Sequence, residues 1–235
     1  MKTKLLLKGL LLALSVIMTA CRKEETPSSR EVVQHGHVMV EVDNVNELEK
    51  MYFMLVSPNT AIVACATDFD TLLVDRKYRG EVVIPETFTH FSHIYTVVGI
   101  KGKAFFECDG LTSLAMPNTV TLIEDKAFEG CSSLKHLELS NTTNLIRSWA
   151  FARCNQLKEV DLPASIETLG DALFAGCSIE TLTCRAIVPP NCWNTPFGYS
   201  DLPAEIQEIR VPQSSVDAYK TAIGWSVYAD KIVGF

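Results

Sequence analysis

Four cysteines stand at a constant interval of 23 residues, at Cys108, Cys131, Cys154 and Cys177. In a repeating fold these thiols would stack one strand apart, within reach of disulfide geometry. Each follows a Phe-x-x step, however, and a buried free cysteine behaves as a small hydrophobe. Zinc would need paired ligands such as Cys-x₂-Cys, which the sequence lacks. The spacing therefore predicts structural thiols, and only a pairing of Cys184 with Cys192 stays open.

The histidines and the known catalytic motifs give no indication of a reaction. His35 and His37 could share one strand face, and His90 and His93 could meet across a turn. Neither pair has a carboxylate or cysteine clustered beside it in sequence, so we interpret all four as exposed loop residues. Gly-x-Ser-x-Gly, His-Glu-x-x-His and phosphate-loop motifs are absent. We expect no enzymatic activity, no catalytic residue, no cofactor and no metal site.

Composition limits the class of protein further. The 235 residues are 47% hydrophobic and 21% charged, which is typical of a globular chain of one or two domains. The net charge of −7 leaves no basic footprint for nucleic acid. Eight cysteines are too few for a disulfide scaffold of this length.

An internal repeat sets the position of the cysteines. Phenylalanines recur with the same 23-residue step at Phe105, Phe128, Phe151 and Phe174. After each cysteine comes an apolar triplet with offsets 0, 3 and 5, often closed by proline, as in Leu111, Leu114, Met116 and Pro117. Residues 97–187 therefore hold four copies of one unit, with a shortened copy before them near Ile84 and a degenerate copy after them from Ile206.

Each unit predicts a fixed order of local structure. The i, i+2 step inside the triplet is strand periodicity, and proline ends the strand because it has no N–H to donate. The stretch from Ile123 to Cys131, closed by Gly130, predicts one helical or 3₁₀ turn. No unit can bury its apolar face alone, so stacked units must share a continuous core.

Several segments resemble the BspA-type leucine-rich repeats (LRR_5 type). They are residues 83–87, residues 95–100, Lys126–Leu134 and the ending from Val211 to Ser226. The resemblance covers roughly residues 78–232. It implies an α/β fold, a right-handed leucine-rich-repeat solenoid of short parallel strands and helical turns over residues 81–212. It also implies a role in adhesion to host matrix or to other bacterial cells.

The repeat array needs a cap at each end. Residues 31–80 are predicted to form a β-rich N-terminal cap, in which Met51–Val56 and Ala61–Thr67 make a hairpin. Residues 213–235 are predicted to form a helical C-terminal cap. Its inward side chains are expected to be Val216, Tyr219, Ile223, Trp225, Tyr228 and Ile232.

The first 20 residues have the pattern of a secretory signal peptide, with three lysines before an apolar stretch. Met18-Thr19-Ala20-Cys21 resembles a bacterial lipoprotein signal, although Met18 stands where leucine is usual. This resemblance implies lipidation of Cys21 and a tether over residues 21–30. Cleavage removes three lysines and no acidic residue, which takes the net charge from −7 to −10.

The tether continues with Lys23-Glu24-Glu25, which is similar to an acidic signal that exports lipoproteins to the outer surface. A plain solvated tether is the alternative interpretation. On the first interpretation the protein is anchored by lipid in the outer membrane and faces the cell exterior.

Binding is expected on the outward positions of the strands. One column holds Ser113, His136, Glu159, Thr181 and Glu208, and the next holds Ala115, Glu138, Asp161, Thr183 and Arg210. Three carboxylates make the middle of this face acidic, which predicts a protein partner with a basic patch; the alternative is a merely solvated sheet face.

These features favour a cell-surface lipoprotein whose solenoid binds protein. One alternative is a structural envelope component without a soluble ligand. Another is a glycan-binding module, for which Trp193, Phe197 and Tyr199 are the candidate stacking residues.

Overall fold

The computed structural model describes residues 29–34, 37–43, 50–65, 77–192, 196–199 and 201–235. The predicted signal peptide and all of the tether before Ser29 lie outside these ranges. In the described part of the chain, no helix is long and apolar enough to cross a membrane.

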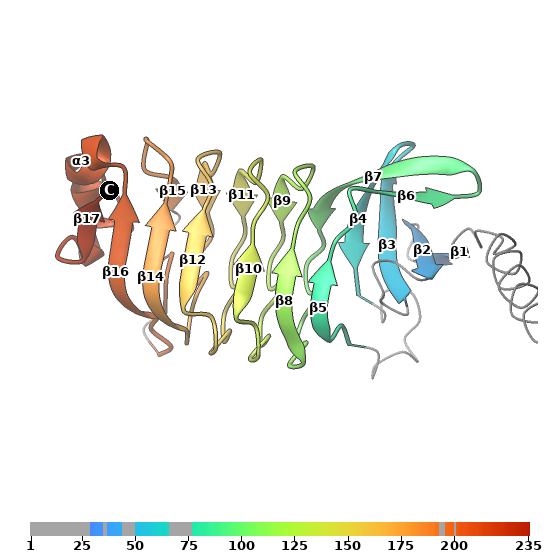
Figure 1. Ribbon diagram of the computed structural model, residues 1–235, viewed down its shortest axis with the longest axis horizontal. Helices are drawn as coiled ribbons and strands as arrows, with labels where there is room; N and C mark the ends of the chain where they lie inside the picture. The colour runs from blue at the N-terminus through green and yellow to red at the C-terminus, as the bar shows by residue number, and fades with distance from the viewer. Residues whose placement is uncertain (1–28, 35–36, 44–49, 66–76, 193–195, 200) are drawn as a thin grey trace, which may run out of the picture.

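Parallel strands form one face of an elongated solenoid, side by side along its axis (Figure 1). They are β5 (Gly80–Val83), β8 (Leu111–Ala115), β10 (His136–Glu138), β12 (Glu159–Leu162), β14 (Ser178–Cys184), β16 (Glu205–Val211) and β17 (Ile232–Gly234). Each predicted triplet lies in or beside one of these strands. The solenoid predicted from the 23-residue step is therefore confirmed.

A second row of short parallel strands lies behind the first (Figure 1). It comprises β9 (Leu122–Ile123), β11 (Leu145–Ile146), β13 (Thr168–Leu169) and β15 (Asn191–Cys192). Their register places Ile123, Ile146 and Leu169 in one column. Units along the array therefore carry a short second strand behind the first.

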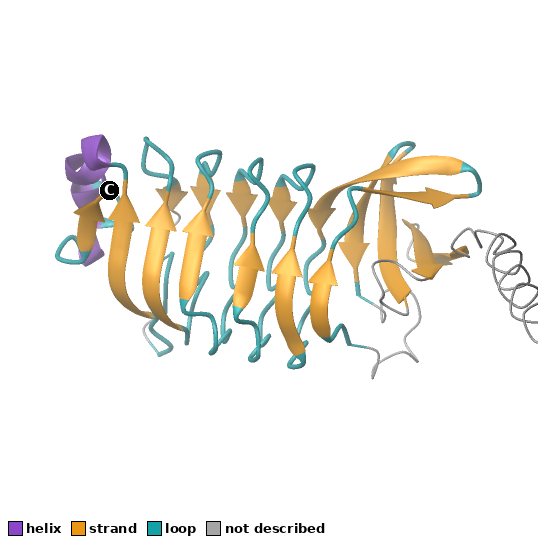
Figure 2. Cartoon of the chain, in the orientation of Figure 1, coloured by secondary structure: helices purple, strands orange, loops and turns teal. Residues whose placement is uncertain are grey.

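The segment that closes each unit is a pair of tight turns, so the predicted helical turn is wrong. Figure 2 shows helix only at the C-terminal end of the described chain. Lys126 and Trp149 adopt φ values of 61° and 63°, which a helix does not allow. These turns aim N–H groups along the solenoid axis: Phe128 N donates to Ala150 O at 2.8 Å. A helix would use such a group within its own segment and could not link neighbouring coils.

The core is a column of phenylalanine rings on the solenoid axis. The rings of Phe105, Phe128, Phe151, Phe174 and Phe197 are fully buried and stack with centroid distances of 4.8, 5.1, 5.8 and 6.2 Å. Tyr78 packs on the first ring at 4.6 Å, and Trp225 meets the last ring edge-on at 4.9 Å. The repeated Phe is thus the main contact between coils.

The N-terminal cap begins with an antiparallel meander. Its strands are β1 (Ser29–Gln34), β2 (His37–Asp43), β3 (Lys50–Ser57) and β4 (Thr60–Ala64). The predicted hairpin is β3–β4, and β4 pairs in parallel with β7 (His93–Ile100), so this hairpin leads directly into the array.

A second hairpin in the cap was not predicted. Strand β6 (Thr87–His90) pairs with β7, and the two central residues of the turn are Phe91 and Ser92. Phe88 of β6 stacks on Phe53 of β3 at 4.2 Å. The hairpin therefore packs against the meander, at the N-terminal end of the solenoid (Figure 1).

The C-terminal cap contains α3 (Val216–Thr221), between the 3₁₀ turns Gln213–Ser215 and Ser226–Tyr228. Tyr219, Trp225 and Ile232 are buried, as predicted. The prediction for Ile223 is wrong, because its side chain is 78% exposed. The helix ends at Thr221 and Ala222 is extended, so Ile223 leaves the inward face.

Candidate functional site

The predicted binding columns lie on the strand face in direct lateral register. His136 pairs with Ser113 and Glu138 with Ala115. Glu159, Asp161 and their partners Thr181 and Thr183 continue the columns on β12 and β14. Glu208 and Arg210 continue them on β16, and Arg210 pairs in turn with Val233 on β17. Every outward position was predictable, because the strand phase fixes the face and the repeat fixes the register.

Nine residues of the two predicted columns line one groove of about 750 Å³ on this face: Ser113, Ala115, His136, Glu138, Glu159, Asp161, Thr181, Thr183 and Arg210. Glu208 does not line it. Lys135, Gln156 and Lys158 also line the groove. A neighbouring cavity of about 510 Å³ shares Glu138 and Asp161 and adds Arg185. The two cavities meet where β10 and β12 end.

Ion pairs make the face less acidic than predicted. Arg185 donates from Nε to both carboxylate oxygens of Asp161, at 2.8 and 3.0 Å, and from Nη2 at 2.6 Å. These hydrogen bonds raise the pKa of Arg185 above its usual value. Glu208 pairs with Arg210 on the same strand. The expectation that Asp161 contributes free negative charge is therefore wrong.

The remaining negative charge of the groove belongs to Glu138 and Glu159. Both side chains are exposed, and within the described ranges neither carboxylate forms an ion pair or hydrogen bond. Lys158, at the start of β12, donates its Nζ to Ser178 O at 3.0 Å. The groove thus has two uncompensated carboxylates at its centre, with Lys135 and Lys158 just before β10 and β12 and Arg210 at its β16 end.

Arg185 was missed as a member of the site, although the sequence carried a signal for it. Arg185 follows the fourth apolar triplet, at the position where the first and third copies have Pro117 and Pro163. A charged residue replaces proline there. The long side chain reaches back to Asp161 of the preceding coil.

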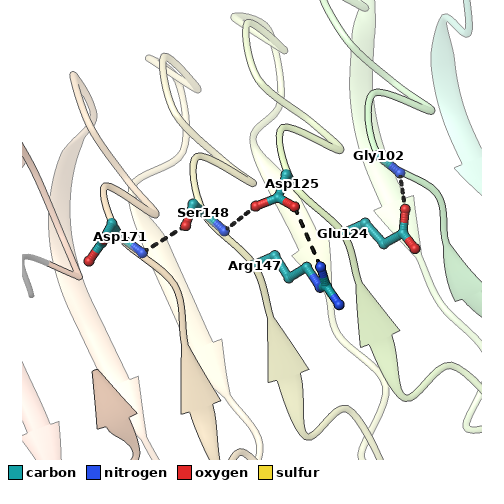
Figure 3. Close-up of polar contacts among 6 residues, drawn as sticks. All are labelled: Gly102, Glu124, Asp125, Arg147, Ser148 and Asp171. Carbon is teal, nitrogen blue, oxygen red and sulfur yellow. Dashed lines mark hydrogen bonds and ion pairs between the residues drawn. The ribbon is translucent and has the colours of Figure 1, made fainter. Parts of the chain in front are cut away.

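A second polar column, on the turns after the short strands, is used by the fold itself. Figure 3 shows side-chain oxygens of one coil that accept backbone N–H groups of the adjacent coil. Glu124 Oε2 accepts from Gly102 N at 2.8 Å, and Asp125 Oδ1 accepts from Ser148 N at 3.1 Å. Arg147 also lies 3.8 Å from Asp125. These groups stabilise coil stacking and leave the strand face as the better binding candidate.

The cysteine ladder is structural, as predicted. Cys131, Cys154 and Cys177 are buried and free, and each Sγ donates to the phenylalanine carbonyl of the preceding coil at 3.1 to 3.3 Å. Burial raises the pKa of Cys177 to about 12, so the reactive thiolate is suppressed. Cys184 and Cys192 are also free thiols.

The remaining candidates for chemistry are separated or buried. His90 is 2% exposed and its Nε2 lies 2.9 Å from Glu31 Oε2, so its expected exposure was wrong. The carboxylate comes from β1, which is distant in sequence. His37 and His93 are exposed as expected, whereas His35 lies outside the described residues. Among the residues that the structure describes, no metal-binding group of His, Cys, Asp and Glu occurs.

The predicted glycan-stacking group does not assemble as expected. Phe197 is fully buried in the aromatic column, so its assignment to a glycan platform is wrong. Tyr199 is 51% exposed and packs on Trp149 at 5.9 Å. Trp193 lies outside the described ranges.

Comparison with known proteins supports the repeat assignment. Six copies of the BspA type leucine rich repeat region match residues 85–190. A leucine-rich repeat protein from Bacteroides capillosus is 30% identical, over 55% of this chain and 94% of that protein, with a TM-score of 0.44. No curated protein matches.

The fold itself is shared with the leucine-rich repeat protein of T. pallidum. That structure has a TM-score of 0.56 and 20% identity, and covers 82% of this chain and 80% of that protein. The matched residues include the four regular copies and end before the degenerate copy at Ile206. The chain belongs to the leucine-rich-repeat proteins, and its residues 85–190 are repeats of the BspA type.

Proposed function

We propose that the chain is a lipid-anchored cell-surface protein that binds a protein ligand in the strand-face groove and acts in adhesion. The observation that carries this proposal is the pair of uncompensated carboxylates, Glu138 and Glu159, at the centre of the groove. The fold does not use them, whereas it does use the polar column of Figure 3. Solenoids bind partners along such extended faces.

The shape of the groove favours a polypeptide ligand. Its lining comes from five neighbouring strands, β8 to β16, and strands lie about 4.8 Å apart. The groove is therefore long enough for an extended segment of several residues. A ligand with basic side chains opposite Glu138 and Glu159 would complement the centre, and acidic side chains would meet Lys135 beside β10 or Arg210 at the β16 end.

Charge reversal tests this surface. The variant Glu138→Lys with Glu159→Lys is compared with Glu167→Lys, whose side chain is exposed outside the groove. Immobilised host matrix proteins and intact bacterial cells are the probes. We expect the double variant to bind at least about tenfold more weakly, since close like charges cost roughly 1.4 kcal/mol or more. Equal binding by both variants would refute the groove assignment.

The anchor and the location need separate tests. Replacement of Cys21 by serine should abolish incorporation of labelled fatty acid and release the protein from membranes. Protease treatment of intact cells should release the repeat body if it faces the exterior. Protection from protease would instead support a structural component inside the envelope.

A further inference from the structure

The tip of the β6–β7 hairpin exposes large apolar side chains at the N-terminal end of the solenoid. Phe91 is 78% exposed and Ile94 is 63% exposed. Val33 on β1 is 65% exposed. Because side chains alternate along a strand, Val33 lies on the same face of β1 as Glu31. Glu31 contacts His90 beside the tip at 2.9 Å, so the three apolar side chains belong to one end of the molecule.

The backbone at this tip is strained, because it holds the bulky residue Phe91 at a positive φ. Phe91 and Ser92 have φ values of 44° and 62°, the left-handed pair of a two-residue hairpin turn. Asn-Gly suits such a turn, and a bulky residue there costs free energy. Packing of Phe91 offsets little of this cost, since the side chain is 78% exposed and its ring contact is with the adjacent His90 ring at 4.2 Å. The fold therefore gives no reason for phenylalanine at this position.

The same end of the molecule lacks charge over two long segments. Residues 51–64 and 87–100 contain no Asp, Glu, Lys or Arg, in a chain that is 21% charged. The mature protein as a whole is strongly acidic, and an acidic body is repelled by an anionic membrane. The uncharged hairpins are the part of the protein that can approach such a surface with the least repulsion.

The proposed anchor at Cys21 would hold this tip close to a membrane. Glu31, which contacts His90, is two residues from Ser29, where β1 begins. Ser29 is only eight positions along the chain from Cys21, a reach of at most about 28 Å when fully extended. As a flexible chain, eight residues span roughly 16 Å on average. Acyl chains on Cys21 would therefore hold the tip at a high effective concentration next to the lipid surface.

We infer that the exposed side chains of Phe91, Ile94 and Val33 insert into the phospholipid surface that holds the Cys21 anchor. This inference rests on the lipidation in the proposed function. Insertion fixes the orientation of the solenoid, with its N-terminal cap on the membrane and its C-terminal cap farthest away. The strand-face groove then stands beside the bilayer and is open to a ligand.

Depth-dependent quenching of tryptophan fluorescence tests the insertion. The full-length lipoprotein is reconstituted into vesicles of phosphatidylethanolamine and phosphatidylglycerol that carry a nitroxide on the fifth acyl carbon. Phe91→Trp and Ile94→Trp report on the tip, and Val188→Trp is the matched control, since Val188 is 76% exposed near the C-terminal cap. The three natural tryptophans are present in all samples and are subtracted with the parent protein.

We expect the added tryptophan at 91 or 94 to lose about half of its emission and to shift to the blue, as for side chains buried about 5–10 Å into the lipid boundary. The tryptophan at 188 should be unaffected. Equal quenching at 91, 94 and 188 would overturn the inference. A blue shift that depends on protein concentration and needs no lipid would also overturn it, because a second copy would then cover the tip.

The anchor and the insertion can fail separately. The mass of the purified protein reports acylation, so an unmodified mass refutes the proposed anchor. In that case the same chain is held by an N-terminal histidine tag on vesicles with a nickel-chelating lipid, and the quenching at 91 and 94 still decides whether the tip inserts.

Discussion

The aromatic column predicts that replacement of Phe151 by alanine nearly unfolds the repeat array. Phe151 is fully buried between Phe128, at 5.1 Å and 3°, and Phe174, at 5.8 Å and 18°. Removal of a buried phenylalanine costs about 3–5 kcal/mol, and aromatic pairs add about 0.5–1.5 kcal/mol each. We therefore expect a loss near 5 kcal/mol, against a total stability of about 5–15 kcal/mol for a typical domain.

The assay is urea unfolding of the chain from residue 22, followed by far-ultraviolet circular dichroism. A loss of 5 kcal/mol corresponds to a decrease in Tm of about 10–20 °C for a chain of this size. The matched control is Phe106→Ala, two repeats earlier, since Phe106 follows a column phenylalanine but is only partly buried and lies under Lys103 at 5.8 Å. The control should lose about 1 kcal/mol or less.

Because the stability of a repeat array depends on contacts between neighbouring coils, the contacts of each ring decide the cost of its removal. At the end of the column, Phe197 has one parallel neighbour at 6.2 Å but also meets Trp225 and Tyr228 edge-on at 4.9 and 5.4 Å, so its replacement should cost about as much as that of Phe151. If Phe151→Ala and Phe106→Ala lowered the stability equally, the column would not be the main contact between coils and the reasoning would be refuted.

Three further changes test other parts of the fold. Burial raises the pKa of Cys177 from 9.0 to about 12, so above pH 9 the unfolded chain releases a proton that the folded chain keeps. Stability should then fall by about 1.4 kcal/mol per pH unit for this thiol up to about pH 12, and Cys177→Ala should show a shallower decrease in urea titrations between pH 8 and 11. Gly170→Ala should lower the free energy of unfolding by about 1–3 kcal/mol, because a Cβ would overlap Ser148 N and lie 2.6 Å from the carbonyl carbon of Arg147. Gly102→Ala is the control: its Cβ would have its nearest contact at 3.2 Å, so it should lower the stability less in the same titration. Phe91→Asn should raise the stability by about 1 kcal/mol, since asparagine tolerates positive φ. Val188→Asn is the control. If Phe91→Asn lowered the stability instead, phenylalanine would not strain the turn at position 91.

The columns of the repeat could be predicted because the four copies within the chain can be compared with one another. The step from Phe128 to Phe151 places two rings in one phase, and the i, i+2 order in each triplet decides which side chains face out. Register followed directly, as the pairing of Asp161 with Thr183 shows. These features depend only on local periodicity and on the fixed length of the unit.

Features decided by contacts between coils were not predictable in the same way. Lys126 and Trp149 carry no sign of left-handed backbone, and the hydrogen bonds to the next coil impose it. The sequence does not predict the β6–β7 hairpin, because Phe91-Ser92 lacks the usual Asn-Gly turn signal. The charge on Asp161 was misjudged because its partner, Arg185, belongs to another coil.

The two ends of the aromatic column differ from its middle. Inside the column, neighbouring rings lie within 3° to 24° of parallel. Tyr78 is tilted by 39° at one end, and Trp225 stands at 76° at the other. A column of parallel rings would present matching faces at both ends, and such head-to-tail contacts grow into open filaments. The tilted rings remove that match and so disfavour end-to-end stacking of one molecule on another.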